Sequence, residues 1–367
     1  MTEDSLAARI ARHIRATGPL SVAAYMTMAL HDREAGYYAR HSPIGAAGDF
    51  VTAPEVSQIF GELIGLWCAD LWDRMGRPAR ITLAELGPGR GTLAGDLLRA
   101  AAALPPFRCA LDLVLVEASP VLRRVQQQRL AAARPRWVEH FEELPPGPLL
   151  LVANEFFDAL PIRQFVRGRA HWAERRVGLD PAGNLVFIAG PEDPAIDLLV
   201  PAALRTAGCG AVAEICPPAL ALTAALGRRL TEAPGAALIV DYGYFPSALG
   251  PTLRALRQHR PVPVLAAPGT ADLSAHVDFA ALAEAARAAG AASFGPVPQG
   301  RFLQALGAEL RLAALAAGAT PTQRRDLASG LERLLDPREM GTLFKALALV
   351  SPGLPAPPGF AEEGSPR

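Results

Sequence analysis

The chain has 367 residues, of which 50% are hydrophobic and 20% charged, and its 36 basic and 36 acidic side chains cancel. This composition is typical of a globular protein with a large core and argues against a disordered chain. The balanced charge argues against a broad nucleic-acid-binding surface, and no apolar run approaches the roughly 18 residues that cross a membrane. We therefore expect neither a nucleic-acid partner nor a membrane span.

The N-terminus and the cysteines bear on the compartment. Residues 6–15 form an amphipathic, Arg-rich stretch that superficially looks like a transit peptide, but Glu3 and Asp4 favour an ordinary helix with acidic residues in its first turn. The four cysteines form no CxxC pair, which predicts buried free thiols in a reducing compartment and no metal site. Together these features predict a cytoplasmic protein.

Helical and strand patterns divide the chain into an extension and a main domain. Residues 1–75 carry helical patterns at about 3–35 and 55–75 and form an N-terminal helical extension. In residues 76–352, apolar runs alternate with helical stretches, which predicts a parallel sheet with crossover helices. The strands are expected at 81–86, 111–116, 148–153, 236–241, 291–297 and 343–350, and the helices at 92–104, 120–134, 217–232, 301–317 and 321–334.

Two insertions and a tail depart from this alternation. Residues 160–208 carry short β-like segments between Pro and Gly, and they predict an inserted hairpin or small subdomain. Residues 245–277 form a long Pro-rich connection after a strand, and a loop of that length indicates a functional site. The tail 353–367 is rich in Pro, Gly and Glu and is expected to be disordered.

A glycine-rich loop follows the strand at 81–86. Gly87, Gly89 and Gly91, with Pro88 between the first two, allow a sharp turn and a close approach of a ligand to the backbone. The spacing G-x-G-x-G differs from the G-x-G-x-x-G of dinucleotide sites, which argues against an NAD dehydrogenase. Glu85 precedes the loop; it would repel a pyrophosphate, but it suits a cofactor with an ammonium group.

Glu117 closes the apolar run 111–116, the next predicted strand. A carboxylate at the end of this strand can accept hydrogen bonds from both hydroxyls of an adenosine ribose. The loop alone is compatible with a purely structural turn, and Glu117 alone with a solvated strand end. Together with Glu85, they predict an S-adenosylmethionine (SAM) site.

Several segments, in order along the chain, resemble the MidA-like SAM-dependent protein arginine methyltransferases. The segments are residues 48–62, 85–91, 154–161, 241–244 and 275–279. The resemblance covers about residues 10–350 and implies a Rossmann-like class I methyltransferase sheet with SAM as the methyl donor. Because the mitochondrial member of the family methylates an arginine of a complex I subunit, it also implies an arginine-containing protein substrate. The segment 250–254 departs from the family pattern.

An arginine acceptor requires carboxylates, because a guanidinium nitrogen becomes nucleophilic only when carboxylates localise the charge on the other nitrogens. Glu155 and Asp158 follow the strand at 148–153 and are the candidates for this role, and Asn154 could accept a hydrogen bond from the acceptor nitrogen. Phe156 or Phe157 could flank the planar cation. The structural alternative is a capped turn with the phenylalanines in the core.

The segment before residue 58 and the end of the strand at 236–241 complete the expected site. Asp49, Thr52 and Glu55 are expected to fold over the cofactor, a role that the resemblance strengthens. The alternative is that Thr52 or Ser57 only caps a helix. Asp241 and Tyr242 are expected to line the acceptor side.

Two other functions stay open at the level of sequence. One is a SAM methyltransferase with a different acceptor, for which a single added carboxylate would suffice. The other is a non-catalytic assembly factor that holds a partner subunit through residues 160–208. A homodimer is compatible with a fold of this kind.

Overall fold

The computed structural model describes residues 5–40 and 52–360, which form two compact units built from interleaved segments of the chain. Unit 1 consists of Met1–Phe50, Asp158–Ala221 and Tyr244–Ala280. Unit 2 consists of Val51–Phe157, Leu222–Gly243 and Ala281–Arg367. In the described residues, no helix is both long and apolar enough to cross a membrane.

Unit 2 is built on a mixed sheet whose strands run in the order β15-β16-β10-β5-β2-β3-β4. The strands are β2 (Ile81–Leu86), β3 (Leu111–Val116), β4 (Arg136–Val138), β5 (Leu149–Asn154), β10 (Gly235–Tyr244), β15 (Ala292–Pro298) and β16 (Phe344–Val350). From β10 to β4 all neighbours are parallel, whereas β16 is antiparallel to both β10 and β15. The expected α/β fold with a largely parallel sheet is confirmed.

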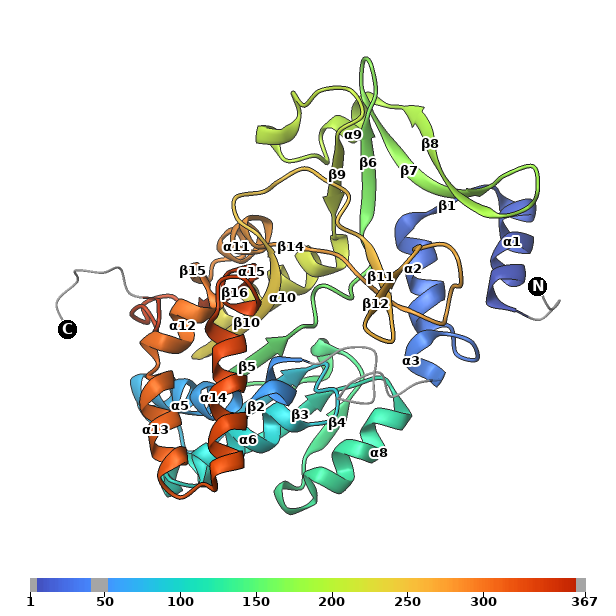
Figure 1. The fold of residues 1–367 in the computed structure, drawn as a ribbon. Helices are drawn as coiled ribbons and strands as arrows, with labels where there is room; N and C mark the ends of the chain where they lie inside the picture. The colour runs from blue at the N-terminus through green and yellow to red at the C-terminus, as the bar shows by residue number, and fades with distance from the viewer. Residues whose placement is uncertain (1–4, 41–51, 361–367) are drawn as a thin grey trace. The chain divides into compact units, whose positions relative to one another are not determined.

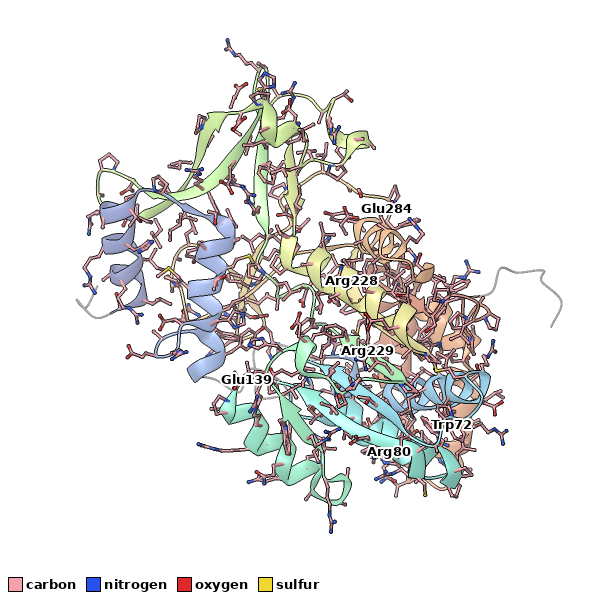
Figure 2. The ribbon with its side chains drawn as sticks, turned by 180° about the vertical axis from the view of Figure 1, so that it is seen from behind. Trp72, Arg80, Glu139, Arg228, Arg229 and Glu284 are labelled. Carbon is pink, nitrogen blue, oxygen red and sulfur yellow. The ribbon has the colours of Figure 1, made fainter. Side chains whose placement is uncertain are left out.

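Helices accompany this sheet, and most of them contribute apolar residues to its core. They are α4 (Ala53–Val56), α5 (Gln58–Arg74), α6 (Thr92–Ala101), α7 (Pro105–Ala110), α8 (Pro120–Arg129), α10 (Pro217–Glu232), α11 (Phe279–Ala288), α12 (Gln299–Ala305), α13 (Ala308–Ala317), α14 (Pro321–Leu335) and α15 (Met340–Leu343), with α10 and α11 assigned by most of their residues. Helices α12 to α15 are orange to red in Figure 1; α12 and α15 contact β15 and β16, whereas α13 contacts α5 and α14 contacts α4. Arg229 of α10, labelled in Figure 2, donates to the carbonyl of Gly147 at 3.1 Å and ties this crossover helix to the loop before β5.

Three local differences from the predicted elements have physical causes. The helix expected at 301–317 is two helices, because Gly307 adopts a left-handed φ of +87° between them. The short elements α7 and β4 were not predicted, since neither is long enough to show a periodic pattern. The tail is ordered as far as Phe360, whose buried ring lies 5.2 Å from that of Phe302, so the prediction of disorder is wrong for residues 353–360. Residues 361–367 lie outside the described part.

Unit 1 joins the N-terminal helices to both insertions. Its elements are α1 (Leu6–Thr17), β1 (Leu20–Ser21), α2 (Val22–His31), α3 (Tyr37–Arg40), β6 (Arg163–Arg167), β7 (Trp172–Leu179), β8 (Leu185–Glu192), α9 (Pro194–Asp197), β9 (Val212–Ile215), β11 (Arg254–Arg257), β12 (Arg260–Val262), β13 (Asp272–Ser274) and β14 (Val277–Asp278). Strands β1, β7, β6 and β9 form an antiparallel sheet with β8 beside β7, and β12, β11 and β13 form a second sheet. Figure 1 shows the insertion at 160–208 as a twisted hairpin with an added strand.

The N-terminal extension is therefore not one structural piece. Apolar residues of α1 and α2, such as Ile10 and Met26, are buried with Ile162, Val177 and Leu273 of the two insertions. Helices α4 and α5 belong instead to unit 2. The sequence shows that α1 and α2 have an apolar face, but it does not show which segment covers that face.

The cysteines also differ from the prediction. All four are free thiols, but only Cys68 is fully buried, and Cys109 and Cys209 are exposed. Burial was inferred from the usual behaviour of free cysteine, which the surroundings of these two residues do not follow.

Candidate functional site

The glycine loop links β2 to α6. Gly87, Gly89 and Gly91 have φ values of +58°, +54° and +75°, a region that costs a residue with a side chain about 1–2 kcal/mol. A Cβ on Gly87 would lie 2.8 Å from Cδ2 of Phe156. Glycine is thus required at position 87 both for its backbone conformation and for space.

Two buried carboxylates flank this loop. Glu85 is the last but one residue of β2 and Glu117 follows the end of β3, and the two strands are neighbours in the sheet. Glu117 accepts the N–H of Ser119 at 2.8 Å and the side-chain amide of Gln126 at 3.1 Å. The carboxyl ends of two parallel strands therefore bring both predicted acidic residues to the glycine loop.

Gln126 of α8 was not anticipated as part of the site. Its amide nitrogen also donates to the carbonyl of Gly89 at 2.8 Å, and its amide oxygen accepts the indole N–H of Trp137 at 2.8 Å. The side chain is fully buried, so it fixes the glycine loop relative to Glu117. A sequence signal existed, because Gln126 lies four residues after Leu122 and four before Leu130, on one helical face.

Burial controls the ionisation of the two acids. It raises the pKa of Glu85 to about 8, an effect that the Ala94 amide reduces and the nearby Glu117 charge increases. Burial also raises the pKa of Glu117, although Ser119 and Gln126 stabilise its ionised form. Buried carboxylates of this kind are suited to receive a cation or hydroxyl donors from a ligand.

We expect the binding of SAM to release a proton from Glu85. The free carboxyl is largely protonated at pH 7, and an ammonium group beside it would favour the ionised form, so affinity should rise between about pH 6 and 8. Calorimetry in two buffers of different ionisation enthalpy measures this release. Glu85→Gln should remove it, and proton uptake by the wild type would contradict the assignment.

Helix α4 carries Glu55, one of the three residues that are expected to fold over the cofactor. Glu55 accepts a hydrogen bond from the hydroxyl of Thr92 and lies 3.9 Å from Arg129 and 4.0 Å from Arg90. This carboxylate thus fastens α4 to the start of α6. Thr52 precedes α4 without a side-chain cap, and Asp49 lies outside the described residues.

The predicted catalytic turn follows β5. Glu155 has a left-handed φ of +50°, and its Oε1 accepts the N–H of Ala53 at 3.0 Å and the amide of Asn154 at 3.1 Å. Within the described residues, Oδ1 of Asn154 is buried without a hydrogen-bond partner. The ring of Phe156 lies against Gly87, which joins this turn to the glycine loop. A strained residue and an unsatisfied buried acceptor are features of functional sites.

The remaining predicted residues lie elsewhere. Asp158 is buried and begins the segment assigned to unit 1, where its carbonyl accepts the N–H of Ala275 at 2.9 Å. The carboxylate of Asp241 is occupied by backbone amides of the turn after β5, so the prediction that it lines the acceptor side is wrong. Unit 2 therefore gathers Glu85, Glu117, Asn154 and Glu155 around the glycine loop.

These residues fit the expected cofactor. SAM carries an ammonium group and a ribose, and the site offers a buried acid for each beside a loop in which three of five residues are glycine. The unsatisfied oxygen of Asn154 is a further acceptor.

Comparisons with known proteins point the same way. Residues 63–297 match the model of a family described as putative S-adenosyl-L-methionine-dependent methyltransferases. The Drosophila melanogaster protein arginine methyltransferase NDUFAF7 homolog is 37% identical over 95% of this chain and 85% of its own. The human protein arginine methyltransferase NDUFAF7 is 36% identical over 92% of this chain and 81% of its own. A likely methyl transferase from Burkholderia thailandensis is 30% identical in sequence. Its crystal structure, bound to S-adenosyl-homocysteine, matches with a TM-score of 0.83 over 98% of this chain and 95% of its own.

These comparisons correct the expected compartment. The Drosophila and human relatives are both named as mitochondrial proteins, so the prediction of a cytoplasmic protein is wrong. That prediction depended on the cysteine pattern and on two acidic residues near the N-terminus, which are indirect signals.

Proposed function

The chain belongs to the family of S-adenosyl-L-methionine-dependent methyltransferases, and we propose that it methylates an arginine of a protein substrate. SAM supplies a methyl group on a sulfonium, which makes the methyl carbon electrophilic. The enzyme's own residues then have to hold the cofactor, orient the acceptor and accept a proton.

The proposed cofactor contacts follow from the geometry of the glycine loop. Glu85 would pair with the ammonium group, and Glu117 would accept the ribose hydroxyls, since the protein donors Ser119, Ala118 and Gln126 do not fill the roughly four acceptor positions of a carboxylate. The backbone of Gly87, Pro88, Gly89 and Gly91 would lie along the cofactor. Thr52, Glu55 and Asp49 stay proposed as residues of the cofactor cap.

The observation that carries the proposed acceptor is the turn at Glu155. The backbone of Glu155 is in a strained, left-handed conformation, and the ring of the next residue, Phe156, lies against Gly87 of the glycine loop. A carboxylate there can hydrogen-bond the guanidinium, localise its charge on the nitrogens that do not react, and take the proton that the methylated nitrogen loses. Asp158, three residues further along the chain, is the second candidate for this role, and Asn154 would orient the reacting nitrogen.

The finer identity of the substrate is also a proposal. The relatives are named as protein arginine methyltransferases, which supports a protein substrate. We propose a subunit of respiratory complex I on the basis of the family resemblance. The homodimer stays a prediction.

A labelling experiment tests the proposed function. Purified protein is incubated with methyl-tritiated SAM and a cell extract, and the labelled protein is hydrolysed to amino acids. We expect label in methylarginine, which also distinguishes monomethylation from the two forms of dimethylation. Label in a metabolite or in another amino acid would select a different acceptor. Binding of SAM without any transfer would favour a non-catalytic assembly factor.

A further inference from the structure

Asp241, a buried carboxylate on β10, accepts hydrogen bonds from the turn that carries Glu155. We propose that Asp241 is a positioning residue, which holds this turn in its reactive conformation without touching substrate or cofactor; this inference builds on the proposed function. Asp241 has 0% exposure. The preceding Val240 pairs with Asn154 across the parallel strands, and its carbonyl accepts the N–H of Glu155 at 2.9 Å.

The hydrogen bonds of Asp241 are directed at the backbone of the turn. Oδ2 accepts the N–H groups of both Phe156, at 3.2 Å, and Phe157, at 3.0 Å. Oδ1 accepts the N–H of Tyr242 at 2.9 Å. Three N–H donors converge on one side chain, and only a carboxylate presents an acceptor to each without also presenting a donor. An asparagine would turn an NH₂ group toward at least one of these donors.

The conformation of Glu155 explains what these bonds do. A glutamate at φ +50° is in a region that side chains disfavour, so the turn persists only if its surroundings fix it. Val240 fixes the amide of Glu155 itself, and Asp241 fixes the next two amides. Without Asp241, the turn is free to relax, which would move the carboxylate of Glu155.

A pair of isosteric variants tests this role. Asp241→Asn should lower kcat for methyl transfer about 10- to 100-fold and leave the Kd for SAM within about threefold, because the proposed cofactor contacts are made by other residues. Glu62→Gln is the matched control. Glu62 is another buried carboxylate of unit 2, only 1% exposed and paired with Arg99 and Arg311. Removing its charge should lower the melting temperature without changing kcat. Asp241→Ala removes both oxygens, whereas an asparagine oxygen in the place of Oδ2 could still accept the N–H groups of Phe156 and Phe157. An unchanged kcat in both Asp241→Asn and Asp241→Ala would overturn the proposal.

A double variant separates positioning from an independent effect. If Asp241 acts through Glu155, then Asp241→Asn combined with Glu155→Gln should be no slower than Glu155→Gln alone. If the fold-decreases in kcat of the two single variants multiply in the double variant, Asp241 acts by another route and the proposal is overturned.

Amide hydrogen exchange tests the same inference when no arginine methylation is found. Phe156 and Phe157 should be protected in the wild-type protein and exchange at least tenfold faster in Asp241→Asn, while the amides of β5 keep their protection. Equal exchange in the two proteins would overturn the positioning role whatever the reaction is. Faster exchange without any methyl transfer by the wild type would instead contradict the proposed function alone.

Discussion

Gly87→Ala is expected to lower the rate of methyl transfer at least about 100-fold and to weaken the binding of SAM. The added Cβ carries two costs. One is the left-handed conformation at φ +58°, and the other is a contact of 2.8 Å with Cδ2 of Phe156. Either the loop or the ring must move, and both belong to the proposed site. Calorimetry with SAM and the initial rate of methyl transfer measure the two effects.

Gly76→Ala is the control for the backbone cost. Gly76 has a φ of +83°, and a Cβ there would meet no atom within 4 Å. The left-handed conformation should cost this variant about 1–2 kcal/mol of stability, as it does at Gly87, but the variant should keep its activity. Equal activity of the Gly87→Ala variant and the wild type would show that this loop does not form the cofactor site. A loss in Gly76→Ala as large as in Gly87→Ala would show that strain alone explains the effect.

Glu155→Gln is expected to lower kcat about 100- to 10,000-fold with little change in the Kd for SAM. A glutamine keeps the shape of the side chain and an oxygen that can still accept the N–H of Ala53. What it removes is the negative charge, which the proposed mechanism needs to polarise the guanidinium and to accept its proton. Single-turnover transfer of the labelled methyl group measures the loss.

Glu284→Gln makes the same chemical change at an exposed position. Glu284, labelled in Figure 2, pairs with Arg287 on α11, and its side chain is 71% exposed. This variant should transfer methyl groups at the wild-type rate. A Glu155→Gln variant within about threefold of the wild type would remove Glu155 from the catalytic residues and leave Asp158 as the remaining candidate.

The cofactor side of the site could largely be predicted from the sequence, because its signals are local. A strand, three glycines and a helix are contiguous, so Glu85 and the loop follow from one short segment. Glu117 required only the rule that parallel strands end at the same edge of a sheet. The strands β2 and β3 and the helix α10 begin and end where their apolar patterns do.

The tertiary structure decided what depends on partners distant in the chain. Gln126 reaches the carbonyl of Gly89 from 37 residues away, and Asp241 reaches the amide of Phe156 from 85. The left-handed turn at Glu155, the burial of α1 and α2 against the insertions and the docking of Phe360 belong to the same class. A periodic pattern shows that a face is apolar or that a carboxylate ends a strand. Which residues cover that face, or donate hydrogen bonds to that carboxylate, is determined only when the folded chain brings the partners together.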